Sequence, residues 1–479
     1  MDMLNKKLVC GILLVLSVSK IFSQNGQIQL SLKEAISLIG SENKSIIVAD
    51  RELEWAKNER QRLNSFWYPQ VTATGAYVHM ANKIEVKESL SQFTDPAIDM
   101  IHSIDPSEQI ITSVLSNIGK SSFSVPLFPQ NVTSVDAIVT LPIFTGGKRI
   151  YAGKVGKLMV DVADVNKKRV TADQLILLVE TYYALRLGQK IVEVKSDTYN
   201  ALEHHYQNAL KLESNGMINK AERLYFQVNR DEAKRELLVS TKDLVIVQNT
   251  FKTLVNIESS ENVLPVSSLF INDLLPDISH FKSLVIKNNY LINGIQLQRK
   301  IQNYQVKIAK SAYLPNIELF GKQTLYANGI SKNLAPRTMI GVGFSWNIFD
   351  GLDREKKIRQ AKINRYIFDI ENEKLEDDMT LAVDKFYNQT QVALDNVTVL
   401  KTTVEMSKEL VRTRQKAYAE GMATSIEVID AELMLSKVRV AILMAYFQFD
   451  SGLIKLLSVC GVPDTFYQYS LNGQDETSF

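Results

Sequence analysis

Cysteine is scarce in this chain of 479 residues, which contains only Cys10 and Cys460. Residues 1–23 place a lysine pair before the apolar run Leu8–Val18 and a small residue at the exit, the pattern of a secretory signal peptide. Because Cys10 lies inside this segment, we expect the mature chain to keep one cysteine. That excludes an internal disulfide and a cysteine-based metal site, so an exported protein of this size must be stabilised by packing.

An excess of charge and a long apolar run are also missing. The 55 basic and 53 acidic side chains nearly balance, which argues against a nucleic-acid-binding protein, where a clustered basic face is expected. The richest apolar stretch after residue 23, Val438–Phe449, is interrupted by Arg439 and Gln448. We therefore expect no membrane-spanning helix. Any membrane-embedded part must consist of closed β-strands, because only helices and barrels satisfy their backbone groups in lipid.

Motifs for catalysis are lacking as well. The sequence has no glycine-rich phosphate loop after a strand and no serine elbow between a strand and a helix. Its histidines are His79, His102, His204, His205 and His280. They are not spaced with carboxylates as a set of metal ligands. His204 and His205 point to different helix faces, as a solvated or packed pair would. We expect no enzymatic activity, no cofactor and no metal site.

What the chain does contain is an internal repeat. Ile143–Gly147 resembles Ile348–Leu352, and Gly216 with its following methionine resembles Gly421 with Met422, both at a shift of 205 residues. Tyr68–Val71 resembles Leu314–Ile317 at a shift of 246. The sequence therefore predicts a duplication. Its parts are a first repeat over 24–255 with an insertion at 80–134, a linker over 256–281, a second repeat over 282–460, and a tail over 461–479.

Each repeat combines long helices with alternating strands. Val397, Val404, Val411 and Tyr418 recur at sevens, which indicates supercoiled helices of ~100 Å. Before one such helix, Ile340, Val342, Phe344, Trp346 and Ile348 alternate with small or polar residues, as barrel strands do. A strand of a soluble β-sandwich is the alternative, but such a strand is seldom followed by so long a helix. We expect helices at 31–67, 147–213, 219–255, 282–312, 352–418 and 424–458, strands at 70–79, 134–144, 316–326 and 336–349, and a polar tail from Val462 that ends in disorder.

This duplicated unit resembles the TolC-type outer-membrane efflux proteins over essentially the whole mature chain. The segments that carry the resemblance are Leu32–Ile36 with Glu42 and Asn43, Tyr68–Val71, Leu314–Ile317, Pro142–Gly147, Asn347–Gly351 and, most specifically, Tyr418–Ala431. The resemblance implies a mixed α+β membrane protein that forms a homotrimer. Each subunit would give four strands to a twelve-stranded barrel in the outer membrane and its coiled-coil hairpins to a periplasmic tunnel. The partners implied are a periplasmic adaptor protein and an inner-membrane pump.

Candidate site residues lie near the two hairpin turns. Glu427 and Asp430 share one face of the last helix. One interpretation is that their negative charges stabilise the positive N-terminal end of this helix. The other is that they form part of a carboxylate ring around a pore entrance. The resemblance places them at the periplasmic constriction, with Tyr418 as a gating tyrosine and Glu222 as the companion in the first repeat. The expected adaptor-docking tips comprise Ser214, Asn215, Gly216, Glu420, Gly421 and Met422. The requirements of a turn alone can also explain this composition.

Other questions stay open at this stage. The insertion 80–134, with a helix-start signal at Asp95-Pro96, is expected at the extracellular end, where it would act as a lid, a partial plug or a phage receptor. The competing functions are a periplasmic adaptor, which has one hairpin flanked by soluble β-domains, and a coiled-coil scaffold without a pore. The exported substrate is open among drugs, metal ions and polypeptides.

Overall fold

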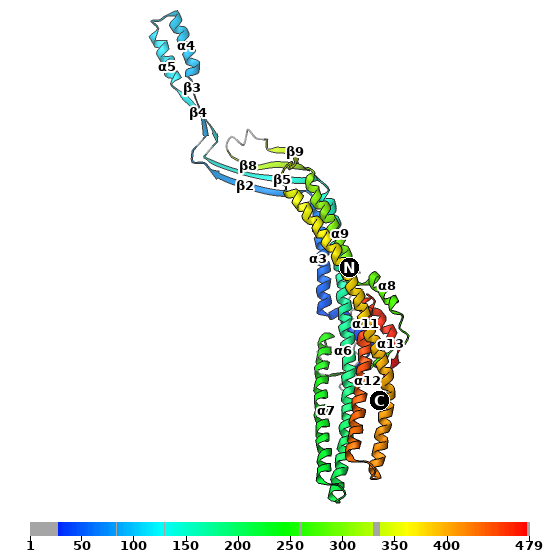
Figure 1. The fold of residues 1–479 in the computed structure, drawn as a ribbon. Coiled ribbons are helices and arrows are strands. Elements are labelled where there is room, and N and C mark those ends of the chain that lie inside the picture. Colours follow the sequence, from blue (N-terminus) through cyan, green and yellow to red (C-terminus); the bar gives the residue numbers. More distant parts are fainter. Residues whose placement is uncertain (1–26, 83, 129, 258–260, 329–335, 477–479) are drawn as a thin grey trace, which may run out of the picture. The chain divides into compact units, whose positions relative to one another are not determined.

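A computed structural model describes residues 27–82, 84–128, 130–257, 261–328 and 336–476. The expected signal peptide lies outside these residues. The chain forms two compact units (Figure 1). A helical unit comprises Met1–Asn58, Lys157–Gln302 and Asn364–Phe479, and a sheet unit comprises Glu59–Gly156 and Asn303–Ile363.

Two pairs of long helices dominate the chain. Helices α6 (Lys148–Ser214) and α11 (Asp353–Ala419) have 67 residues each, and the helices that follow them, α7 (Lys220–Leu254) and α12 (Ser425–Val459), have 35 each. At 1.5 Å per residue the longer pair measures ~100 Å. The predicted lengths are confirmed, and the bounds agree within two residues.

The shorter predicted helices are each broken in two. Helix α2 (Leu32–Glu42) is followed by α3 (Lys44–Asn64), and α8 (Ile278–Asn288) by α9 (Tyr290–Lys310). Single helices over 31–67 and 282–312 are therefore wrong. An asparagine leaves the helix at each break and caps the next one. The Oδ1 atom of Asn43 accepts from the N–H of Ser45 at 2.9 Å, and that of Asn289 accepts from Leu291 at 2.8 Å.

Short 3₁₀ turns lead from these helices into the sheet. They are η1 (Ser65–Trp67) before β2 (Gln70–His79) and η2 (Ser311–Tyr313) before β8 (Asn316–Ala327). Strands β5 (Asn131–Thr145) and β9 (Thr338–Ser345) complete an antiparallel sheet in the order β2-β5-β8-β9. All four predicted strands are present, β5 beginning three residues earlier and β9 ending four residues earlier than expected.

The register of the sheet separates apolar from polar side chains. Val71 lies opposite Val139, which lies opposite Gly321, and this glycine lies opposite Ile340. Because side chains alternate between the two faces of a sheet, Val71, Val139 and Ile340 share one face, whereas Phe320, which lies opposite Thr140 and Gly341, is on the other face. The alternation read from the sequence is confirmed.

The core of the helical unit contains α6, α7 and α12 and the segment between the repeats. Strand β1 (Gln27–Leu30) pairs in parallel with β6 (Asn262–Pro265). Leu269 and Phe270 are buried, and Phe270 contacts the rings of Tyr183, Phe449 and Phe466. This segment therefore packs on the helices, as predicted.

The C-terminal tail is folded as far as Glu476, the last residue that the structure describes. It forms η3 (Pro463–Thr465), α13 (Phe466–Leu471) and β10 (Gln474–Asp475), which pairs with β7 (Phe270–Ile271). Phe466 is buried, and the Glu476 carboxylate binds the Arg186 guanidinium at 2.6 Å. One aromatic anchor and one ion pair thus hold this mostly polar segment, and the predicted disordered end of the tail lies outside the described residues.

The insertion forms a small hairpin of its own. Strands β3 (Ile84–Ser89) and β4 (Ser122–Phe128) pair with each other and enclose α4 (Ser91–Ile104) and α5 (Gln109–Gly119). The predicted helix start at Asp95-Pro96 is wrong. Helix α4 begins four residues earlier, and Pro96 lies inside it.

One described helix, α12, is long and apolar enough to cross a membrane. However, 61% of its most apolar window is buried inside the protein, and Tyr446, Phe449 and Leu453 are fully enclosed. The helix thus has the burial of a core helix.

Candidate functional site

The two long hairpins end in matching turns. Gly216 and Gly421 adopt φ angles of 73° and 72°, which favour glycine because it has no Cβ. In each turn the N–H of the next residue, Met217 or Met422, donates at 2.8 Å to a carbonyl five residues earlier. This is the Schellman arrangement of a helix end. The predicted tip residues Ser214, Asn215 and Glu420 are exposed beside these glycines.

Each helix after a tip begins with a side-chain cap. Asn219 Oδ1 accepts from the N–H of Glu222 at 3.0 Å, and Thr424 Oγ1 accepts from the N–H of Glu427 at 3.4 Å. The Glu427 carboxylate also reaches back to Thr424, which completes a capping box. Two of the predicted site residues therefore lie in the first turn of a capped helix.

Glu427 also has a cationic partner that sequence reasoning missed. The Arg414 guanidinium donates to its carboxylate across the hairpin turn. Hydrogen bonds from Thr424, and then the charge of Arg414, lower the pKa of Glu427 below its ordinary value. No sequence signal marked Arg414, because its partner lies 13 residues away on the next helix.

Asp430 differs from Glu427. It is exposed one turn further along α12 and has no ion-pair partner within the described part of the chain. Of the two predicted carboxylates, Glu427 is therefore neutralised by a residue of the same chain, whereas Asp430 is exposed to the solvent.

Tyr418 packs into an apolar cluster near the tips. Its ring meets Phe226 edge to face at 6.3 Å, and Ile429 is buried in the same cluster. Burial, and to a smaller extent the charge of Glu222, raise the pKa of Tyr418. Its hydroxyl is buried and has no hydrogen-bond partner among the described residues.

A polar cluster lies beside Tyr418 in a cavity of about 560 Å³. Its lining includes His204 and His205, and His205 Nε2 lies 3.6 Å from the Glu432 carboxylate. Gln415 donates to the same carboxylate at 2.7 Å. His205 also stacks on Phe226, whereas His204 is exposed, so one member of the pair is packed and the other is solvated. Among the described residues, no group of three or more potential metal ligands occurs.

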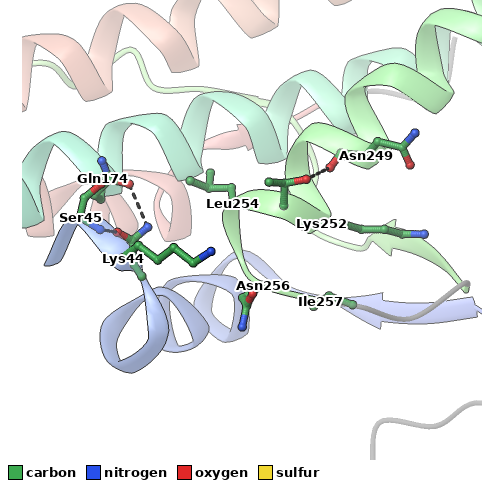
Figure 2. Close-up of a pocket in the computed structure, with 10 residues that line it drawn as sticks. Lys44, Ser45, Gln174, Asn249, Lys252, Leu254, Asn256 and Ile257 are labelled. Carbon is green, nitrogen blue, oxygen red and sulfur yellow. Dashed lines mark hydrogen bonds between the residues drawn. The ribbon is translucent and has the colours of Figure 1, made fainter. Parts of the chain in front are cut away.

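A second cavity, of about 640 Å³, lies where α2 meets α3 and α7 ends (Figure 2). Asn43 Nδ2 donates to Gln174 Oε1 at 2.9 Å on one side, and Lys44 and Lys252 flank the opening. The residues that line it include neither a carboxylate nor an imidazole. They therefore supply no acid–base pair for catalysis.

The comparisons with known proteins agree on one family. Residues 283–462 match the outer membrane efflux protein family, which consists of transport channels rather than enzymes. A comparison with curated proteins finds no match.

Several solved structures share the fold. VceC from Vibrio cholerae is 13% identical with a TM-score of 0.69, and the match covers 90% of this chain and 96% of VceC. CusC is 13% identical with a TM-score of 0.71, covering 90% and 92%. The open state of the MtrE channel from Neisseria gonorrhoeae is 15% identical with a TM-score of 0.67, covering 90% and 88%. The predicted resemblance is thereby confirmed: residues 283–462 match the outer membrane efflux protein family, and the chain has the fold of VceC, CusC and MtrE.

Proposed function

We propose that this protein is the outer-membrane exit duct of a tripartite efflux or type I secretion system and works as a homotrimer. The observation that carries the proposal is a four-stranded sheet with one apolar, solvent-exposed face, joined to helices of 67 residues. In a soluble adaptor or scaffold such a face would be exposed to water, whereas a barrel strand must present apolar side chains to lipid.

The two faces of the sheet support this assignment. On one face Val71, Val342 and Phe344 are exposed. On the other face the Asp136 carboxylate accepts from Lys322 at 2.9 Å and from Thr324 at 2.7 Å. We assign the first face to the lipid and the second to the aqueous lumen, because ion pairs in barrels belong on the water-filled side.

The edges of the sheet support a trimer. Strands β2 and β9 each have one neighbour among the described strands. In lipid an open edge leaves backbone groups without partners, so these edges must pair with other copies. Three copies of four strands close a barrel of twelve.

Exposed apolar stripes on the helices support the same assembly. Val392, Val399 and Met406 recur at sevens along α11 and are exposed. On α7, Val239 and Ile246 are likewise exposed and seven residues apart. Seams of this kind pack against another helix in a coiled coil, and we assign both seams to the contacts between subunits.

We further propose that the tips form the periplasmic mouth. There Asp430 would supply the open charge of a carboxylate ring, Glu427 with Arg414 would fix the helix end, and Tyr418 and Glu222 would lie at the constriction. Met217 and Met422 are equally exposed, at 71%, and suit adaptor docking because methionine adapts to varied surfaces.

The repeat is part of the same proposal. Helices α2 and α8 begin 246 residues apart, whereas α6 and α11 begin 205 apart. These are the two shifts read from the sequence, so we infer that the channel subunit arose by duplication and that the domain bounds follow the repeats.

The test combines mass and conductance. Full-length protein purified in detergent is expected to give a trimer in native mass spectrometry and cation-selective channels in planar bilayers. A monomer, or a trimer without conductance, would overturn the assignment, the latter in favour of a scaffold. Recovery in the carbonate-soluble fraction of cells would favour a periplasmic adaptor instead.

A further inference from the structure

The hairpin inserted between β2 and β5 exposes large apolar side chains. On α4 these are Phe93, Met100 and Ile104, with exposed fractions of 70%, 65% and 74%. On α5 they are Ile111, Val114 and Ile118. Monomeric soluble surfaces rarely gather so many large apolar residues, so this face requires a partner.

The contact between α4 and α5 leaves these residues outside. The buried residues of the hairpin are Thr94, Thr112 and Gly119. A side chain at Gly119 would collide with Thr94, so the helices approach closely there. The Thr112 hydroxyl donates to Glu108 O at 2.8 Å within its own helix. Small residues thus occupy the closest approach of the two helices, Ile98, Ile101 and Leu115 are half-buried, and the larger side chains named above stay exposed.

The exposed stripes emerge on one side of the hairpin. At ~100° per residue, the stripe with Phe93 and Met100 lies about a quarter turn from Thr94 on α4. On α5, the stripe with Val114 and Ile118 lies at a similar angle from Gly119. The rotation about the helix axis has the same direction as on α4. Because the two helices of a hairpin are antiparallel, equal displacements place both stripes on the same side. The result is one apolar face, which we call the hairpin face.

Charge argues against a lipid surface as the partner of this face. From Ser91 to Gly119 the chain has no lysine or arginine, and its charged residues are Asp95, Asp99, Asp105 and Glu108. Helices that lie on membranes carry cationic residues that attract anionic headgroups. Four carboxylates are repelled by such headgroups.

The position of the insertion favours other copies of the same hairpin. It leaves the sheet after His79 and returns at Asn131, and these two residues are paired. They form the end of the sheet opposite to Thr145, which precedes α6. In the proposed trimer, three hairpins therefore start from one rim. We propose that the hairpin faces of three copies pack on one another into a six-helix bundle, an inference that rests on the proposed trimer.

Cysteine substitution tests this contact, because Cys460 is buried and Cys10 lies in the expected signal peptide. Met100→Cys places a thiol on the hairpin face, and Asp99→Cys places one on the adjacent polar side. In intact cells we expect Met100→Cys to form a disulfide-linked dimer under mild oxidation, since one thiol per copy joins two copies. We expect Asp99→Cys not to do so. A membrane-impermeant maleimide should label Met100→Cys about tenfold more slowly than Asp99→Cys.

The same variants separate the two proposals. Native mass spectrometry reports whether each purified variant is a trimer. A trimer in which Met100→Cys is labelled as fast as Asp99→Cys and forms no dimer would overturn the hairpin contact alone. Slow labelling without a disulfide would also overturn it, in favour of lipid or another protein. Loss of the trimer in both variants and in the unsubstituted protein would overturn the proposed function itself.

Discussion

The Arg149 guanidinium lies over the ring of Trp67 at 4.1 Å, at the point where β5 passes into α6. In the second repeat Arg354 lies over Tyr313 at 4.5 Å. The glycines before these helices have positive φ angles, and the sharp turn leaves carbonyls without strand partners. Arg354 donates to Asn347 O at 2.8 Å and to Ile348 O at 3.1 Å. One arginine thus joins an aromatic ring to the end of a strand in each repeat.

Arg354→Lys is predicted to destabilise this junction. A lysine retains the charge but lacks the planar fork that stacks on a ring and binds two carbonyls at once. We expect a loss of about 1–3 kcal/mol, measured as a lower midpoint of thermal unfolding in detergent. Arg359→Lys, an exposed position on the same helix, is the matched control. Equal midpoints for the two variants would contradict a role for the fork.

The sheet predicts unequal tolerance on its two faces. Val342→Lys places a charge on the assigned lipid face and should impair insertion by about 2–4 kcal/mol near the bilayer midplane. Ser345→Asp lies on the other face and should be tolerated. The amount of heat-modifiable protein in outer-membrane fractions measures both. Equal yields from the two variants would show that the faces are assigned wrongly.

The long elements were predictable from the sequence because their signals repeat. Heptads along α11 fix its extent, and Gly421 marks the turn because few other residues adopt its φ. The breaks at Asn43 and Asn289 were not predictable from periodicity, since the apolar pattern continues across each asparagine. Only the side-chain cap that follows reveals them.

The candidate site was predictable only in part. Local rules identify Thr424 and Glu427 as a helix start, and the tip glycines follow from turn chemistry. Arg414 was missed because its bond to Glu427 joins two helices across a turn. The folded part of the tail was missed for a related reason: Phe466 finds its partners in Tyr183 and Phe270, which are distant in sequence.

The two mouth carboxylates should separate under mutation. Glu427→Ala removes the capping box and the partner of Arg414, so we expect a lower midpoint of thermal unfolding. Asp430→Asn removes an exposed charge and should lower cation selectivity without a change in thermal stability. Reversal potentials in a salt gradient and thermal midpoints are measured for both variants. Unchanged selectivity in Asp430→Asn would remove this residue from the pore mouth.

Asp450 gives the last prediction, which concerns pH. Its side chain is fully buried on α12. Burial raises its pKa well above the ordinary value, the nearby backbone of Phe270 opposes this, and the Glu476 charge adds to it. The folded chain therefore holds a proton that the unfolded chain releases above pH ~4.

The sign of the effect follows from proton binding. Between pH ~4 and the raised pKa of Asp450, the unfolded state binds fewer protons than the folded state, so the free energy of unfolding decreases as pH rises. Asp450→Asn keeps the shape of the side chain and cannot ionise. We expect the variant to exceed the unsubstituted protein in thermal midpoint at pH ~8 and to lose this advantage toward pH ~4. Asp464→Asn, an exposed position in the same unit, should change neither midpoint. A variant that is less stable at pH ~8 would show that Asp450 is ionised and held by a bonded partner, contrary to the burial argument.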